Sequence, residues 1–432
     1  MYIGIDLGTT GCKVVLFDAN GGEIKQFNKE YPLICRGNFV EQDAHLWWQL
    51  VTEGMAYVAQ GCGEQVKGIS VSTQGISFVP VDEAGAPLSN AITWLDTRAE
   101  AENAQLAEAL GADRIYRITG KFANPCYTLP KLMWLKRHQP ELYEKAHAFM
   151  LPLDFLNFRL TGIALCDYSI AGGIMAYDLE NKCYSKEILE VAGIPETMLP
   201  KVGCMGQFVG GLLPEAAALT GLTPGCPVFL GGQDQKLAAL GAGIREKAIT
   251  VSFGTASAVT RLTKFLPEQQ DFSRFRFNED YYSYEGVVDT SGAALKWLTS
   301  ILDADGYEAM NALAVEAGGS GGVRFCTDLT TGGSITGLTL ATTRGNLVYA
   351  LFEGVSRKIG EFADAMGGCE ELYLFGGGSK SPIWCQVLAN VTGKKVVALS
   401  TPETASLGAA ILASQGTVPP ATPAKIYEKE AV

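Results

Sequence analysis

The chain is acidic and has the composition of a globular protein. It contains 432 residues, of which 47% are hydrophobic and 19% charged, and its formal net charge is −12. Since single hydrophobic cores rarely grow beyond roughly 250 to 300 residues, we expect two domains, residues 1–244 and 245–432. The negative charge disfavours nucleic acid as a partner. The amino terminus shows no basic segment followed by an apolar run, so we expect a cytoplasmic protein that makes no contact with a membrane.

The cysteines and histidines favour no metal or redox centre. The 11 cysteines never occur as C-x-x-C, and the chain has only 3 histidines. Zinc sites and thioredoxin-like centres need closer spacing. We therefore expect buried, reduced thiols.

Strand and helix patterns alternate along the chain. An apolar strand at Tyr2–Leu7, a turn at Gly8–Gly11 and a returning strand at Lys13–Phe17 predict an opening β-hairpin. Further along, periodicity predicts a strand at Gly68–Ser72 and helices at Ala44–Ala59, Ala99–Leu110 and Leu129–Lys136. This mixture predicts an α/β protein.

A short internal repeat supports the division into two domains. Ile249–Ala256 can be laid over Ile3–Thr10 with the same apolar spacing and the same Gly-Thr step, and Ser252 then corresponds to Asp6. We expect two similar folds that face each other.

The first candidate site is the turn that follows the opening strand. Small residues there let backbone N–H groups approach a phosphate, while the hydroxyls of Thr9 and Thr10 and the charge of Lys13 bind its oxygens. Asp6 can hold Mg²⁺ or accept a proton. An ordinary hairpin with a turn-capping aspartate is the alternative.

The second candidate lies in Val228–Gly243, which reads as a buried strand, a Gly-Gly break and a helix that begins at Asp234. A carboxylate at that place can take the proton from an attacking hydroxyl. A helix cap without a catalytic role is the alternative, since aspartate is a favoured cap.

Glycine marks a third candidate near the carboxyl terminus. After the strand at Glu371, Gly376–Gly378 form a turn, and a helix follows with Ser381 as its cap. Such a turn lets a flat ring such as adenine lie against the main chain. We expect the helix Thr404–Ala413 to pack beside it. A nicotinamide cofactor is the alternative, although the G-x-G-x-x-G fingerprint is absent.

Two further candidates, one polar and one aromatic, interrupt strand-like apolar stretches. Gln74 can bind sugar hydroxyls, and Trp94 can cover the C–H face of the same sugar, although Trp94 also fits the interior of a core.

Taken in order, these elements resemble the FGGY carbohydrate kinases, the group that contains xylulokinase, glycerol kinase and gluconate kinase. The likeness covers nearly the whole chain and is xylulokinase-like. Its markers are D-L-G-T-T at Asp6–Thr10, W-x-D-x-R at Trp94–Arg98, G-G-x-D-Q at Gly231–Gln235 and G-G-G-S-K-S-P at Gly376–Pro382.

The resemblance implies two ribonuclease-H-like domains of the actin, hexokinase and Hsp70 type, with a cleft between them that takes a sugar and MgATP. The activity implied is transfer of the ATP γ-phosphoryl group to a hydroxyl of a pentulose such as xylulose or a related ketose. Asp234 would be the general base, and Asp6 and Asp234 would hold Mg²⁺. The nucleotide and phosphate residues would be Thr9, Thr10, Lys13, Gly254, Thr255, Gly292, Gly377, Gly378 and Ser381; the sugar residues would be Gln74, Gly75, Ile76, Trp94, Asp234 and Gln235.

Two departures and two rival functions accompany this resemblance. Ile76 stands where xylulokinases usually have a histidine, and the region from Gly321 to Asn346 is short and lacks the family's G-E-R-x-P loop. The rivals are a nucleotide-switch protein of the actin or Hsp70 type and an inactive scaffolding relative. A homodimer is compatible with the resemblance, which fixes no interface.

Overall fold

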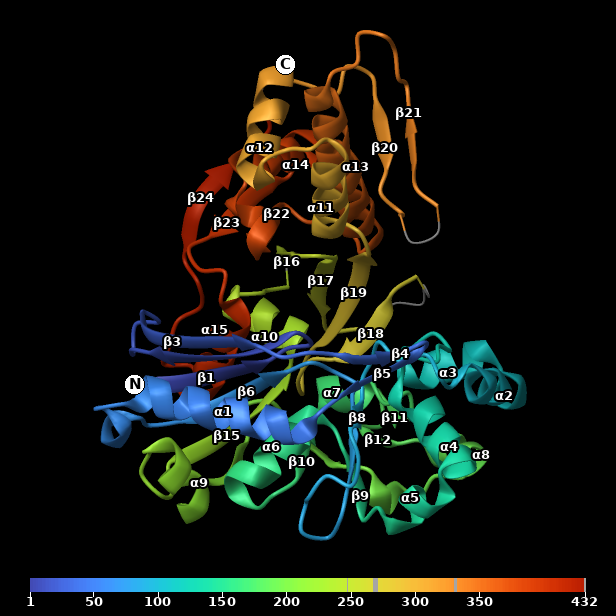
Figure 1. The fold of residues 1–432 in the computed structure, drawn as a ribbon, viewed down its shortest axis with the longest axis vertical. Helices are drawn as coiled ribbons and strands as arrows, with labels where there is room; N and C mark the ends of the chain where they lie inside the picture. The colour runs from blue at the N-terminus through green and yellow to red at the C-terminus, as the bar shows by residue number, and fades with distance from the viewer. Residues whose placement is uncertain (247, 267–270, 330–331, 431–432) are drawn as a thin grey trace. The chain divides into compact units, whose positions relative to one another are not determined.

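The protein divides into two compact units. The computed structural model describes residues 1–246, 248–266, 271–329 and 332–430. The first unit comprises Met1–Gly241, Lys264–Tyr282 and Ala405–Pro420, and the second comprises Ala242–Thr263, Ser283–Thr404 and Ala421–Val432. Each unit is built around its own mixed sheet (Figure 1). The predicted α/β class is therefore confirmed, while the division at residue 244 stays a prediction.

The first unit holds the greater part of the secondary structure. Its strands are β1 (Tyr2–Leu7), β2 (Gly11–Phe17), β3 (Glu23–Glu30), β4 (Ile34–Arg36), β5 (Phe39–Gln42), β6 (Ile69–Thr73), β7 (Val79–Val81), β8 (Ala91–Ile92), β9 (Ala148–Met150), β10 (Leu165–Asp167), β11 (Tyr177–Asp178), β12 (Cys183–Tyr184), β13 (Lys201–Gly203), β14 (Phe208–Gly211), β15 (Pro227–Gln233) and β18 (Ser273–Arg276). Its helices are α1 (Ala44–Ala59), α2 (Glu100–Leu110), α3 (Ala112–Thr119), α4 (Thr128–His138), α5 (Pro140–Lys145), α6 (Pro152–Thr161), α7 (Tyr168–Gly172), α8 (Lys186–Ala192), α9 (Pro214–Thr220), α10 (Asp234–Gly241) and α15 (Thr404–Ala413).

The main sheet of the first unit has the order β14-β15-β6-β1-β2-β3. β1 is antiparallel to β2 and parallel to β6, and β15 is parallel to β6. Helices cover the sheet, so the aliphatic side chains of β1 and β2 are fully buried: Ile3, Ile5, Leu7, Val14, Val15 and Leu16. The carboxyl ends of β1, β6 and β15 therefore meet at one edge.

Two helices show how sequence fixes the packing on this sheet. α1 begins after Asp43, whose side chain accepts a hydrogen bond from the backbone N–H of His45, and it packs against β1, β2 and β3. α15 approaches β1 so closely that a Cβ on Gly4 would lie 1.9 Å from the carbonyl oxygen of Ser406. α15 also lies close to α10, where a Cβ on Gly408 would lie 1.9 Å from the carbonyl oxygen of Leu237. The expectation that α15 packs beside the Gly376–Gly378 turn stays a prediction.

The second unit repeats this topology. Its strands are β16 (Ala248–Phe253), β17 (Ser257–Thr263), β19 (Tyr282–Val288), β20 (Arg324–Cys326), β21 (Ser334–Thr336), β22 (Glu371–Phe375), β23 (Lys395–Leu399) and β24 (Pro423–Tyr427), and its helices are α11 (Gly292–Ile301), α12 (Gly306–Ala317), α13 (Arg344–Ala365) and α14 (Pro382–Thr392). The order β19-β17-β16-β22-β23 matches β3-β2-β1-β6-β15. β16 is antiparallel to β17 and parallel to β22, as β1 is to β2 and β6. This equivalence confirms the two ribonuclease-H-like folds.

One predicted break is absent. Gly231 and Gly232 lie inside β15, where the pairing with β6 shifts register between Phe229 and Gly232. A Cβ on Gly231 would lie 1.7 Å from the carbonyl oxygen of Val71, so glycine is required by the close approach of two strands.

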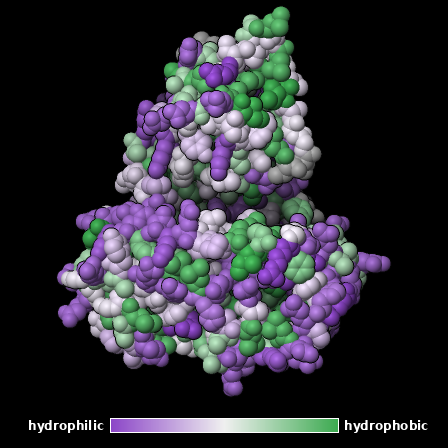
Figure 2. Space-filling model, in the orientation of Figure 1, coloured by the Kyte–Doolittle hydropathy of each residue, from purple (hydrophilic) through white to green (hydrophobic). Residues whose placement is uncertain are grey.

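Fewer of the thiols are buried than the sequence predicted. All 11 cysteines are unpaired thiols, but only four of them are buried: Cys12, Cys166, Cys226 and Cys385. In Figure 2 hydrophobic surface covers the segment after β21, where Leu338 and Leu340 are exposed. Within the described residues, no helix combines the length and the hydropathy needed to cross a bilayer.

Candidate functional site

Two carboxylates lie at the same edge of the first unit's sheet. Asp6 is in register with Ser72 of β6, and Gly232 of β15 is in register with the same Ser72 from the other side. Asp234 follows at the carboxyl end of β15. Neighbouring strands are about 4.8 Å apart, so the strands that carry the two carboxylates are separated by roughly 10 Å with β6 between them. Both residues are half-buried, and Asp6 Oδ1 accepts a 2.7 Å hydrogen bond from Ser72 Oγ.

The turn after β1 is held from several sides. The N–H of Gly8 donates to the carbonyl of Gly11 at 3.0 Å, and the hydroxyl of Tyr31 donates to the carbonyl of Gly8. The amide of Gln42 donates to the carbonyl of Thr9 at 2.6 Å. Across the hairpin, Lys13 is in register with Asp6. The turn therefore has a fixed backbone.

The segment after β6 holds three of the predicted sugar residues. Gln74 is 1% exposed; its Nε2 donates to Gln42 Oε1 at 2.7 Å, and its Oε1 accepts from Ser77 Oγ at 3.2 Å. Gly75 lies against the side chain of Gln233. Ile76 has a φ of +56°, a conformation that costs a branched residue about 1–2 kcal/mol, and its carbonyl accepts a bond from Thr128.

The W-x-D-x-R motif separates into a supporting part and an exposed part. Arg98 and Asp96 form a buried ion pair at 2.7 Å, and Asp96 also accepts from the N–H of Val40. Trp94, in contrast, is 39% exposed, so the alternative in which Trp94 is a core residue was wrong. Its indole N–H donates to Thr9 Oγ1 at 2.8 Å.

A buried lysine supports the Trp94 segment from below. Lys131 Nζ donates to the carbonyl of Thr93 at 2.7 Å and to that of Cys126 at 2.6 Å. Burial lowers the pKa of Lys131 to about 8, since the charged form loses its hydration. Nothing in the sequence pattern singled out this lysine.

The residues around Asp234 include two that the sequence reasoning missed. Gln233 Nε2 and the N–H of Gln235 each donate to Asp234 Oδ1 at 2.7 Å. Within the described part of the chain, Thr73 Oγ1 and Gln233 Oε1 are buried without a hydrogen-bond partner. Buried polar atoms are almost always paired, so such atoms at this edge are typical of a place where water or a polar ligand binds. Only the place of Gln233 inside the G-G-x-D-Q motif, and that of Thr73 directly before Gln74, could have signalled them.

A buried carboxylate lies under β15. Asp167 accepts hydrogen bonds from the N–H groups of Ser169 and Ile170, and Ser169 Oγ in turn accepts from the N–H of Gln233. Burial raises the pKa of Asp167 to about 6, although these donors oppose the shift. Asp167 thus supports the strand that leads to Asp234.

In the second unit, the turn after β16 is closed by the start of α11. The N–H of Gly292 donates to the carbonyl of Gly254, and the N–H groups of Ser291 and Ala293 donate to the carbonyl of Thr255, at 3.0 to 3.2 Å. These N–H groups at the start of α11 are therefore already paired with the turn. The predicted places of Gly254, Thr255 and Gly292 in a nucleotide site stay predictions.

The glycine turn after β22 is shaped by Phe253. A Cβ on Gly378 would lie 1.9 Å from the ring of Phe253, whereas one on Gly377 would meet nothing within 4 Å. Ser381 caps α14 by accepting from the N–H of Trp384, which confirms the predicted cap, and its hydroxyl donates to Asn311. The face of Gly377 is therefore open.

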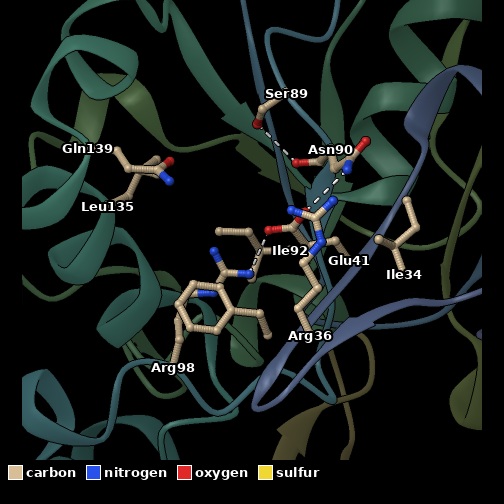
Figure 3. A pocket seen from close by; sticks show the side chains of 10 residues that line it. Ile34, Arg36, Glu41, Ser89, Asn90, Ile92, Arg98, Leu135 and Gln139 are labelled. Carbon is tan, nitrogen blue, oxygen red and sulfur yellow. Dashed lines mark hydrogen bonds and ion pairs between the residues drawn. The ribbon is translucent and has the colours of Figure 1, made fainter.

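Each unit also contains a pocket. The first, of about 330 Å³, is lined on one side by Glu41, whose carboxylate accepts from Arg98 and Asn90 (Figure 3). The second, of about 380 Å³, is lined by Asp289 after β19, by Asp328 after β20 and by the face of α13 that carries Arg357. None of the predicted site residues lines either pocket.

The fold and this sheet edge define an α/β protein made of two units of ribonuclease-H-like topology. Residues 1–241 match the N-terminal domain, and residues 249–416 the C-terminal domain, of the FGGY family of carbohydrate kinases. The chain belongs to this family, as the motifs predicted.

Known relatives align with most of the chain in sequence and in structure. The chain is 31% identical to the xylulose kinase of Bacillus subtilis (strain 168), over 96% of this chain and 88% of the relative. It is 30% identical to the L-fuculokinase of Escherichia coli (strain K12), over 81% of this chain and 78% of that protein. Among solved structures, the xylulose kinase from Rhodospirillum rubrum is similar with a TM-score of 0.92 and 26% identity, covering 99% of this chain and 94% of that one.

Proposed function

We propose that the protein is an ATP-dependent pentulose kinase, which transfers the γ-phosphoryl group of ATP to a hydroxyl of xylulose or a related ketose. The observation that carries the proposal is the pair Asp6 and Asp234 at one sheet edge, half-buried and separated by β6. Full-length similarity to xylulose kinases supports the ketose. Membership of a carbohydrate kinase family does not favour the nucleotide-switch alternative.

In the proposed reaction, Asp234 removes the proton from the attacking sugar hydroxyl. Gln233 Nε2 and the N–H of Gln235 hold its Oδ1, so the carboxylate keeps one orientation toward the substrate. The Thr9–Thr10 turn and Lys13 bind the phosphoryl group, and Trp94 covers the sugar. The nucleotide is held by Gly254, Thr255, Gly377, Gly378 and Ser381.

Asp6 and Asp234 would hold Mg²⁺, which supplies charge stabilisation at the transferred phosphoryl group. Carboxylate oxygens at a half-exposed edge fit this ion, because Mg²⁺ prefers hard oxygen ligands and usually keeps several waters. We also propose a cytoplasmic location, while a homodimer stays compatible with the family.

The test is a coupled ADP-release assay over ketoses, polyols, aldonates and deoxysugars, with wild type, Asp234→Asn and Asp43→Asn. We expect turnover on a pentulose and a loss of about 10² to 10⁴-fold in kcat for Asp234→Asn, the usual contribution of a general base. Asp43→Asn is the matched control, since Asp43 only caps α1.

Two outcomes would contradict the proposal. Near-normal turnover of Asp234→Asn would remove Asp234 from the chemistry and leave it a helix cap. ATP binding without turnover on any sugar would favour the nucleotide switch.

A further inference from the structure

We propose that Gln42 and Ser77 are positioning residues that couple Trp94 to the Gly8–Gly11 turn through a closed ring of hydrogen bonds. This inference rests on the proposed function, in which Trp94 covers the sugar and the turn binds the phosphoryl group. The ring joins four segments that are distant in the sequence, and all of them belong to the first unit.

The ring has two branches that both begin at Trp94 and end at Thr9. The short branch is the bond from the Trp94 indole N–H to Thr9 Oγ1, at 2.8 Å. The long branch starts at the backbone N–H of Trp94, which donates to Ser77 Oγ at 3.1 Å, and Ser77 Oγ donates to Gln74 Oε1 at 3.2 Å. Gln74 Nε2 then donates to Gln42 Oε1 at 2.7 Å, and Gln42 Nε2 donates to the carbonyl of Thr9 at 2.6 Å.

The direction of every bond in the long branch is fixed from its two ends. An indole N–H can only donate, and that of Trp47 donates to Gln42 Oε1 at 3.2 Å, so the amide of Gln42 must point its Nε2 at Thr9. Gln42 Oε1 then requires the Nε2 of Gln74, so Gln74 turns its Oε1 to Ser77 and must accept the hydroxyl hydrogen there. The backbone N–H of Trp94 only donates, and it takes a lone pair of the same Ser77 hydroxyl. A reversed amide at Gln42 would place two donors face to face, and a reversed amide at Gln74 would place two acceptors face to face.

The side chains of the long branch are buried, whereas Trp94 is exposed to solvent. Gln42 and Ser77 are 0% exposed and Gln74 is 1% exposed, whereas Trp94 is 39% exposed. Buried polar networks that are fully paired hold one geometry, because each broken bond leaves a partner unsatisfied. A sugar that contacts the exposed indole would therefore fix the Thr9–Thr10 turn through the buried members.

The test compares Ser77→Ala with Ser70→Ala in full-length protein. Ser70 is also 0% exposed and lies in β6, but within the described residues its hydroxyl has no hydrogen-bond partner, so it is a matched control. Thr9→Val, which removes the acceptor of the short branch, is compared with Thr9→Ser, which keeps it. The first readout is the indole N–H signal of Trp94 in ¹⁵N-tryptophan-labelled protein, assigned by its loss in Trp94→Phe.

We expect the Trp94 signal to move in Ser77→Ala and Thr9→Val and to stay in place in Ser70→Ala and Thr9→Ser. In the kinase assay, Ser77→Ala should raise the KM for the sugar and lower kcat, with a loss of about 5- to 10-fold in kcat/KM, the scale of one hydrogen bond. Ser70→Ala should match the wild type.

Failure of the ring is distinguishable from failure of the proposed function. A Trp94 signal that neither Ser77→Ala nor Thr9→Val moves would overturn the ring, even in an active kinase. Equal kinetics for Ser77→Ala and Ser70→Ala would likewise overturn it. A wild type that phosphorylates no sugar would overturn the proposed function alone, because the indole signal is measured without turnover.

Discussion

The two Gly-Thr turns have the same backbone surroundings and different side chains. In the first unit, Asp6 is in register with Lys13 on one neighbouring strand and with Ser72 on the other. In the second unit, Ser252 takes the place of Asp6, and its partners in register are Ala258 and Phe375. The ionisable side chains at these register positions therefore belong to the first turn.

The carbonyls of the two turns are also tied in different ways. In the first turn, side chains bind the carbonyls of Gly8 and Thr9. In the second turn, backbone N–H groups at the start of α11 bind the corresponding carbonyls of Gly254 and Thr255. A turn that is held by side chains can be coupled to other segments through those side chains. The second turn is a closed backbone unit, which suits a rigid platform for a nucleotide.

The sharpest way to break this comparison is Asp6→Ser, which gives the first turn the residue of the second. Ser72 keeps a polar partner, so the fold should survive. We expect kcat to fall about 10²-fold or more, since a metal-assisted charge contribution is worth several kcal/mol. Ser252→Ala, measured in the same assay, should change kcat little. Equal effects of the two variants would show that the chemistry is not confined to the first turn.

The next difference concerns the helix that covers each central strand. Gly4 of β1 corresponds to Thr250 of β16 in the internal repeat, and at Gly4 a Cβ would overlap the backbone of Ser406. Backbone of a packed helix cannot move aside, so Gly4→Ala should lower the free energy of unfolding by about 3 kcal/mol or more. Thr250→Ala, at a buried site that holds a side chain, should cost about 1 kcal/mol. Urea denaturation measures both, and similar losses would contradict the close approach.

Local sequence patterns predicted where helices and strands begin and end, but they did not predict which elements contact one another. The bounds of α1 and the cap of α14 at Ser381 follow from signals within a few residues, and the structure has them as predicted. The close packing of α15 on β1 joins residues about 400 positions apart, and no local signal encodes it. For the candidate site the motifs located Asp6 and Asp234, but Gln42 carries no signal of its own, because its role arises only where four segments meet.

A third difference is buried charge. Asp167 of the first unit is fully buried with a pKa of about 6, against an ordinary value of 3.8, whereas Asp305 of the second is exposed before the start of α12. The folded state holds the proton of Asp167 more tightly than the unfolded state, so Asp167 lowers stability as the pH rises from about 4 to about 6. The pKa difference of about 2 corresponds to about 3 kcal/mol. Asp167→Asn, which can still cap α7, should lose this dependence.

The measurement for Asp167 is the free energy of unfolding of wild type and Asp167→Asn at several pH values between 4 and 7. The difference between them isolates Asp167 from other buried acids such as Asp154. If the free energies of unfolding of wild type and Asp167→Asn changed with pH in parallel, the raised pKa of Asp167 would be contradicted. Asp305→Asn serves as the exposed control, since Asp305 makes no side-chain hydrogen bond to the start of α12.

The smallest expected effect is the difference between alanine substitutions at Gly377 and Gly378, two adjacent glycines after β22, the strand that corresponds to β6. Gly378→Ala would place a Cβ against the ring of Phe253, which also packs on Trp384 with ring centroids 4.6 Å apart. The ring has little room to turn, so we expect a loss of about 1–3 kcal/mol in unfolding free energy. Gly377→Ala meets open space and should leave stability nearly unchanged while weakening ATP binding, since the added methyl would stand where the adenine is proposed to lie. Isothermal titration with ATP, beside urea denaturation of both variants, tests this split; unchanged ATP affinity in Gly377→Ala would move the adenine away from this turn.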